Sequence, residues 1–167
     1  MTFGSGKVGN AVVLDATSLV AIPDAPTLSP SAITVEAWIQ PTQLPASRMG
    51  IFDNNNSYGF FVLSTGGVRC TVNVAVEATP VITQLGAWTY VACTYDGTTA
   101  RLYVDGAEVA VAGGGTALGT GDTSGSVLGG NSPSGDPFVG AIDQVRVFSV
   151  ARTADEVCIA AGRTPPC

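Results

Sequence analysis

Asp53 begins the densest group of side chains in the sequence that could recognise a ligand. It is followed by Asn54, Asn55 and Asn56, and Tyr58 comes two residues later. Carboxylates and amides exchange hydrogen bonds with sugar hydroxyls, and an exposed aromatic ring offers a platform against which a sugar can pack. The same oxygen atoms are ligands that calcium prefers, although Asn and Asp are also common in solvated turns because they tolerate left-handed backbone. The segment therefore predicts a glycan-binding site, with calcium assistance or a plain turn as alternatives.

The residue types argue against catalysis. The sequence has no histidine, which excludes Ser-His-Asp and Cys-His nucleophile systems and a mixed Cys/His zinc site. Glycoside hydrolysis needs two carboxylates about 5–10 Å apart. Glu36, Glu77 and Glu108 stand alone in the sequence, and Glu156 lies at the start of an expected helix. We therefore expect no enzyme, and a glycoside hydrolase that depends on Glu36 is the remaining catalytic hypothesis.

Charge limits the classes of partner. Among 167 residues there are 7 Lys and Arg and 13 Asp and Glu, which gives a net charge of −6 and no basic stripe. Nucleic acid and anionic membranes are therefore not expected as partners. No run reaches the ~20 apolar residues that span a bilayer, so membrane insertion is not expected either. Charged residues make up only 12% of the chain, and such a surface could also pack against other protein subunits.

The four cysteines are Cys70, Cys93, Cys158 and Cys167. Four cysteines allow three disulfide pairings. We predict a bridge between strands, Cys70–Cys93, and a local loop, Cys158–Cys167, with four buried thiols as the alternative. Disulfides form in oxidising compartments, so we expect an extracellular or secreted protein. No signal peptide follows Met1, which favours an excised domain or mature fragment over the alternative of a reduced cytosolic protein.

The apolar pattern is that of half-buried strands. In the segment Ile33–Ile39 the aliphatic residues occupy every second position, and the Asp-Gly pairs at residues 96–97 and 105–106 favour tight turns between antiparallel strands. We expect strands over Asn10–Leu14, Leu19–Ile22, Ile33–Ile39, Met49–Phe52, Tyr58–Leu63, Val68–Val74, Ala87–Tyr95, Thr99–Val104, Ser126–Leu128 and Val139–Val150. Many short strands with turns between them predict an all-β sandwich.

One helix is expected, near the C-terminus. Thr153 and Glu156 have the spacing of a capping box, in which each side chain bonds to the other residue's backbone amide. Gly162 stands where a helix ends, and Pro165-Pro166 cannot continue it. The span Gly113–Pro137, rich in Gly, Ser and Thr, is expected to form loops around the short strand Ser126–Leu128.

Several segments resemble one family, in order along nearly the whole chain. They are Gly6–Asp15 with Val20–Asp24, the central strand "ITVEAWIQP" at Ile33–Pro41, Gly86–Ala110 and Phe138–Val157. These segments are similar to the laminin-G-like jelly rolls of the concanavalin A-like group. The resemblance implies one domain over residues 1–167, an all-β two-sheet antiparallel jelly-roll sandwich with a short C-terminal helix.

The sequence also has a weaker likeness to pentraxins. The segments Ile51–Val62 and Val127–Asp143 fall where pentraxins place two calcium-carrying loops, and Asn131 and Asp136 are the polar residues in the second loop. The acidic cluster that pentraxins have there is absent. Cys93 matches a pentraxin half-cystine, but Ala37 stands at the position of its partner, which is the reason for pairing Cys93 with Cys70 instead.

The resemblance also implies a structural calcium ion. Many laminin-G-like jelly rolls carry one, and Asp143 lies in the matching motif, with Asp15 or Asp24 as the second ligand where the N- and C-terminal strands are expected to meet. The calcium ion is thus predicted at Asp143, Asp15 and Asp24.

Together these observations predict a non-catalytic extracellular recognition or adhesion domain that binds glycans or glycosylated surfaces. The expected ligand-binding residues are Asp53, Asn54, Asn55, Asn56, Tyr58, Asn131 and Asp136. The alternative is a structural subunit or domain of a larger extracellular assembly that acts through protein–protein contacts.

Overall fold

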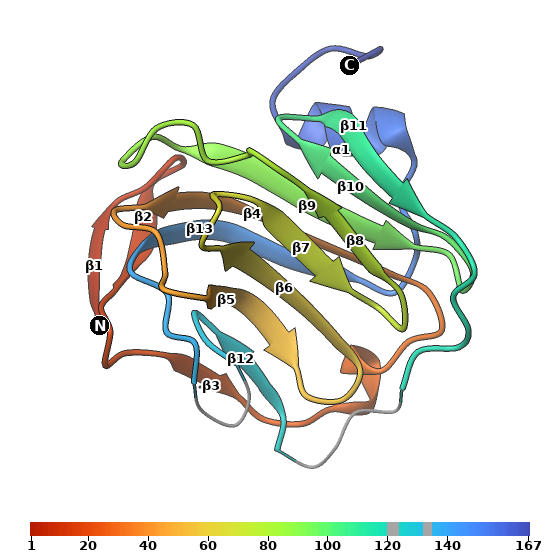
Figure 1. The fold of residues 1–167 in the computed structure, drawn as a ribbon, viewed down its shortest axis with the longest axis horizontal. Coiled ribbons are helices and arrows are strands. Elements are labelled where there is room, and N and C mark those ends of the chain that lie inside the picture. The colour runs from red at the N-terminus through yellow and green to blue at the C-terminus, as the bar shows by residue number, and fades with distance from the viewer. Residues whose placement is uncertain (120–123, 132–134) are drawn as a thin grey trace.

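Two antiparallel sheets lie face to face in the computed structural model, which describes residues 1–119, 124–131 and 135–167 (Figure 1). In the seven-stranded sheet the spatial order is β1 (Thr2–Ser5), β2 (Asn10–Leu14), β13 (Gly140–Phe148), β4 (Ile33–Pro41), β9 (Thr89–Tyr95), β10 (Ala100–Val104) and β11 (Ala107–Ala112). In the six-stranded sheet the order is β3 (Val20–Ile22), β12 (Ser126–Leu128), β5 (Arg48–Asn54), β6 (Tyr58–Leu63), β7 (Val68–Thr71) and β8 (Ala75–Ala78). The predicted jelly-roll sandwich is confirmed.

The main core fills the space between the sheets because alternate side chains of each strand point inward. In β4, the aliphatic side chains predicted to share one face, from Ile33 to Ile39, are each at most 2% exposed. They meet Phe60 and Val62 of the facing sheet in one hydrophobic cluster. The core contributes most of the stability through removal of apolar surface from water.

Most expected strands are present with shifted ends. The expected strand over residues 139–150 is β13, and it pairs with β2 through Gly140 and Leu14 as well as with β4. Three strands were not predicted, β1, β8 and β11. The N- and C-terminal strands thus meet as expected, but the two chain ends lie apart: Figure 1 shows the N-terminus at the β1 edge and the C-terminus beyond α1. Within the expected loop region, residues 120–123 and 132–134 lie outside the described residues.

Both predicted disulfides are present. Cys70 in β7 is bonded to Cys93 in β9, which links the two sheets across the core. Cys158 in the helix is bonded to Cys167, which attaches the C-terminal tail. A covalent loop reduces the conformational entropy of the unfolded chain, so both bonds stabilise the fold.

The expected helix is α1 (Ala154–Ala160). A short 3-10 helix, η1 (Pro26–Leu28), lies between β3 and β4. The Thr153–Glu156 capping box forms as predicted, and Gly162 has a positive φ of 76° after the last turn. Val157 packs against Tyr90 and Tyr103 on the outer face of the seven-stranded sheet. Within the described residues, no helix is long and apolar enough to cross a membrane.

Candidate ligand-binding site

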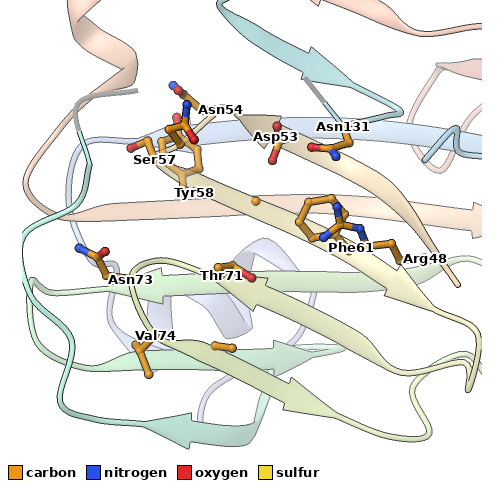
Figure 2. A pocket seen from close by; sticks show the side chains of 13 residues that line it. Arg48, Asp53, Asn54, Ser57, Tyr58, Phe61, Thr71, Asn73, Val74 and Asn131 are labelled. Atoms are coloured by element: carbon orange, nitrogen blue, oxygen red, sulfur yellow. The ribbon is translucent and has the colours of Figure 1, made fainter. Parts of the chain in front are cut away.

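A pocket of about 330 Å³ lies on the outer face of the six-stranded sheet, at the small end of the size range of ligand sites. Its lining comes from β5, β6, β7 and the start of β8, from the turns between β5 and β6 and between β7 and β8, and from the segment that follows β12 (Figure 2). Thr71 and Asn73 form one exposed border, and Asn131 contributes to another. We call this face, with its pocket, the open face.

Asp53 and Gly59 stand opposite each other in the β5–β6 pair and form the floor of the pocket. A side chain on Gly59 would place its Cβ 2.7 Å from Asp53 Oδ1 and 2.4 Å from the Phe61 ring. Only glycine therefore leaves room for the carboxylate and the ring to converge at this point. Asp53 is 6% exposed, so its carboxylate lies at the bottom of the pocket.

Arg48 closes one side of the pocket. Its Nε donates to Asp136 Oδ2 over 2.7 Å, and its guanidinium lies 4.5 Å from the centre of the Phe61 ring. Figure 2 shows Arg48 beside Phe61. Asn131 Nδ2 also donates to Asp136 Oδ2, over 3.3 Å. The predicted residues Asn131 and Asp136 are thus neighbours, and Asp136 acts through Arg48 rather than as part of the lining.

The loop that carries Asn131 and Asp136 is held against β5 by the backbone. Gly50 N donates to the Asp136 carbonyl over 2.8 Å. A Cβ on Gly50 would lie 1.9 Å from the Gly130 carbonyl oxygen, so glycine is required for this close approach. The close contact explains why a loop about eighty residues away in sequence reaches the pocket.

Tyr58 and Asn54 support the wall of the pocket. The Tyr58 hydroxyl and Asn54 Nδ2 both donate to the Leu28 carbonyl, over 3.0 and 2.9 Å. Tyr58 is 4% exposed and stacks on Phe52, and burial raises the pKa of Tyr58 to about 12. The expectation of an exposed aromatic platform at Tyr58 is therefore wrong.

The turn between β5 and β6 has the left-handed backbone that its sequence indicates. Asn56 has a φ of 63°, is exposed and lines the pocket. Ser57 donates its hydroxyl to the Gly119 carbonyl over 2.7 Å, which fixes the turn. Asn55 is half-buried and lies outside the lining. Of the three asparagines, Asn56 is thus the one best placed to contact a ligand.

Several lining residues were not predicted from the sequence, among them Arg48, Phe61, Thr71 and Asn73. Thr71 lies on the polar side of its predicted strand, so strand alternation could have found it. Arg48 precedes the predicted strand by one residue, and its pairing with Asp136 leaves no trace in the sequence.

The predicted calcium ligands are not brought together. Within the described residues, no group of three or more acidic or cysteine side chains could hold a metal. Asp15 accepts from Thr17 and Ser18, and the Thr17 hydroxyl and amide lower the pKa of Asp15 to about 2. Asp143 accepts backbone amides at both oxygens, from Val8 over 2.9 Å and Gln144 over 2.7 Å.

Calcium takes six to eight oxygen ligands, and each Asp143 oxygen shares its lone pairs with one backbone N–H group. Neither Asp15 nor Asp24 joins Asp143 in a group of three. Calcium binding by the protein stays a prediction, and a comparison of Tm with added calcium and with EDTA tests it.

Glu36, the acid of the hydrolase hypothesis, lies on the outer face of the seven-stranded sheet and is 0% exposed. Its Oε1 accepts from Arg146 over 3.0 Å, and its Oε2 accepts from Arg152 over 2.6 Å and from the Tyr90 hydroxyl over 2.9 Å. Burial and the Glu36 charge raise the pKa of Tyr90. Both oxygens of this carboxylate accept from protein donors, as in a structural network. We call this face, with α1 over it, the closed face.

Comparison with known proteins assigns the family. The profile of the concanavalin A-like lectin/glucanases superfamily matches residues 14–158, most of the chain. The chain belongs to this superfamily. This concanavalin A-like domain is 34% identical to human pappalysin-1 over 110 residues, which are 63% of this chain and 6% of that protein. The chain thus spans a small part of the length of this curated relative.

Solved structures share the concanavalin A-like fold. Domain 4 of AbnA, an extracellular GH43 arabinanase from Geobacillus stearothermophilus solved with arabinotriose, superposes with a TM-score of 0.76 at 24% identity, over 95% of this chain and 80% of that one. A SAP-like pentraxin from Limulus polyphemus superposes with a TM-score of 0.62 at 20% identity, over 86% of this chain and 74% of that one. Both likenesses, including the predicted one to pentraxins, hold at the level of the fold.

Proposed function

We propose that the chain is a non-catalytic, extracellular recognition domain that binds glycans in the pocket of the open face. The observation that carries the proposal is the convergence of a carboxylate, amides and a hydroxyl on one pocket, from Asp53, Asn56, Thr71 and Asn131. Hydroxyl-rich ligands need such mixed donors and acceptors, because each buried sugar hydroxyl must replace its bonds to water.

Two further observations support the proposal. The solved domain from the arabinanase was studied in complex with arabinotriose, which is a ligand of the class that we propose here. The two disulfides suit an oxidising compartment outside the cytoplasm.

The arrangement of acids supports a binding domain rather than a hydrolase. Asp53 is the one carboxylate among the described residues that line the pocket, whereas glycoside hydrolysis uses a pair. Glu36 lies on the opposite face, where its carboxylate accepts hydrogen bonds from two arginines and a tyrosine. Asp136, the neighbouring acid, accepts from Arg48 and Asn131 and does not line the pocket.

A glycan array followed by calorimetry tests the proposal. The wild type is expected to bind at least one class of oligosaccharide, and the double variant Thr71→Ala plus Asn131→Ala is expected to lose at least tenfold in affinity. Two hydrogen bonds at about 1 kcal/mol each justify this size. Asn55-Asn56-Ser57 is an acceptor motif for N-linked glycosylation, so the protein is best produced in a bacterial periplasm, where the disulfides also form.

The matched control is the double variant Thr83→Ala plus Asn10→Ala, which alters exposed residues of the same types away from the pocket. This control should bind as the wild type does. Absence of binding to every glycan, or equal loss in both double variants, would contradict the proposal.

A second candidate function is assembly with other protein chains, and the edges of the seven-stranded sheet favour it. Phe3 on β1 is 72% exposed, and Val109 and Val111 on β11 are 45% and 55% exposed. Edge strands with exposed apolar residues are templates for pairing with another strand. If the partner is a second copy of this chain, light scattering without sugar should show an oligomer that the variant Val109→Lys plus Val111→Lys converts to a monomer. A monomeric wild type would exclude such self-assembly.

A further inference from the structure

The charges of the open face carry an inference about the class of glycan. All seven Lys and Arg residues lie in the part of the chain that the structure describes. Among them Arg48 alone lines the pocket. Arg69, the other arginine on this face, is paired with Glu77 over 2.8 Å. The pocket therefore has a single cation with which to meet an anionic ligand.

That cation is already engaged. Arg48 Nε lies 2.7 Å from Asp136 Oδ2, and the Phe61 ring lies under the guanidinium. A ligand carboxylate would meet a guanidinium whose charge Asp136 already balances and whose Nε–H is already used, so this arginine attracts it less than an unpaired one would. Asn131 also donates to Asp136 Oδ2, so Asp136 holds two of the donors that an acidic sugar would otherwise use.

Asp53 is a second obstacle to the binding of an acidic sugar. Its carboxylate is at the floor of the pocket and is 6% exposed. In such a partly desolvated place, a like charge on the ligand is repelled more strongly than it would be in water. Counted together, Arg48, Asp53 and Asp136 give this part of the site a net charge of −1, in a protein whose total is −6.

We propose that this pocket selects uncharged glycans and rejects sugars that carry a carboxylate, such as uronic and sialic acids. Asp53 and Asp136 are the specificity-determining residues: Asp53 repels the ligand carboxylate, and Asp136 withholds Arg48 from it. Specificity of this kind comes from an unfavourable contact with the wrong ligand as well as a favourable one with the right ligand. The inference rests on the proposed function of the same pocket.

Matched ligands separate charge from shape. For the best neutral oligosaccharide found on the array, oxidation of a primary hydroxyl gives the carboxylate derivative, and conversion of that carboxylate to its methylamide gives an uncharged one of similar size. We expect the carboxylate derivative to bind the wild type at least tenfold more weakly than the methylamide. The difference should shrink as sodium chloride is raised from 20 to 500 mM, because salt screens the repulsion.

Two isosteric variants test the assigned residues. Asp136→Asn frees Arg48, and asparagine tolerates the positive φ of 44° at this position. We expect each of Asp136→Asn and Asp53→Asn to reduce the discrimination against the carboxylate derivative at least fivefold. Asp155→Asn removes an exposed carboxylate of α1, outside the pocket lining, and is the control that should leave the discrimination unchanged.

The outcomes distinguish this inference from the proposed function. A wild type that binds the carboxylate derivative as tightly as the methylamide overturns the inference and leaves glycan binding intact. Discrimination that persists in both aspartate variants overturns the assignment to Asp53 and Asp136. Binding of no glycan at all overturns the proposed function together with the inference.

Discussion

The two outer faces of the sandwich both carry an arginine–carboxylate pair, but they differ in what covers it. On the closed face, Glu36 is 0% exposed and receives Arg146, Arg152 and Tyr90 beneath the segment that leads into α1. On the open face, the Arg48–Asp136 pair has side chains 38% and 28% exposed beside a pocket. Both faces pair arginine with a carboxylate, so the cover decides which pair is structural and which is available to a ligand.

The largest effect should come from the closed face. Glu36→Gln leaves two guanidiniums without a counter-charge, and we expect the free energy of unfolding in urea to fall by about 3 kcal/mol. The folded variant should bind glycan within twofold of the wild type, since the pocket lies on the other sheet. A stable Glu36→Gln variant that has lost binding or a hydrolytic activity would reverse the roles that we assign to the two faces.

Filling the floor of the pocket should make the open face, like the closed face, unable to bind a ligand. Gly59→Ala puts a Cβ into the space that Asp53 and Phe61 occupy, so we expect a loss of about 1–3 kcal/mol in stability and at least tenfold in glycan affinity. Gly113→Ala is the control, because nothing lies within 4 Å of its added Cβ. Unchanged binding by Gly59→Ala, measured by calorimetry, would move the site elsewhere.

A variant in the capping box of α1 tests how much this helix, which covers the closed face, contributes to stability. Thr153→Ala removes one cap of the helix, and we expect Tm to fall by about 3 °C at pH 7 without a change in glycan affinity.

The same capping box predicts a pH dependence. The Thr153 amide and hydroxyl hold the pKa of Glu156 below its usual range. A lowered folded-state pKa stabilises the protein above the unfolded-state pKa and loses this effect as the pH falls through the lowered value. The difference in Tm between wild type and variant should therefore shrink below about pH 4, and a difference that grows with acid would contradict this account.

The smallest effect is expected for the other ion pair of the open face. Arg69 and Glu77 are both about 40% exposed and lie outside the pocket lining. Arg69→Gln should change stability by less than about 0.5 kcal/mol and glycan affinity by less than twofold, because exposed pairs contribute little. A larger loss of affinity would extend the binding surface across β7 and β8.

The sequence predicted the sandwich well because strand alternation and turn residues report local geometry. Alternation in Ile33–Ile39 marked the inward face of β4, and the Thr153–Glu156 spacing located α1. The site was predicted only in part. Tyr58–Leu63 is apolar on both sides, so nothing in it shows that Tyr58 faces the core while Phe61 faces the pocket.

Long-range contacts account for the rest of what was missed. Arg48 and Asp136 are 88 residues apart, and their pairing depends on how the loop after β12 packs on Gly50. No local pattern encodes such a contact. The same holds for the predicted calcium ligands Asp15, Asp24 and Asp143, whose order in the chain says nothing about where their side chains meet.

An NMR titration of the ¹⁵N-labelled domain with the neutral oligosaccharide that binds most tightly on the array locates the site directly. We expect amide shift changes to concentrate on the open face, at Asp53, Asn56, Gly59, Thr71 and Asn131, and to spare the residues around Glu36. Shift changes centred on the closed face or on the sheet edges would show that the domain does not bind its ligand in the open pocket.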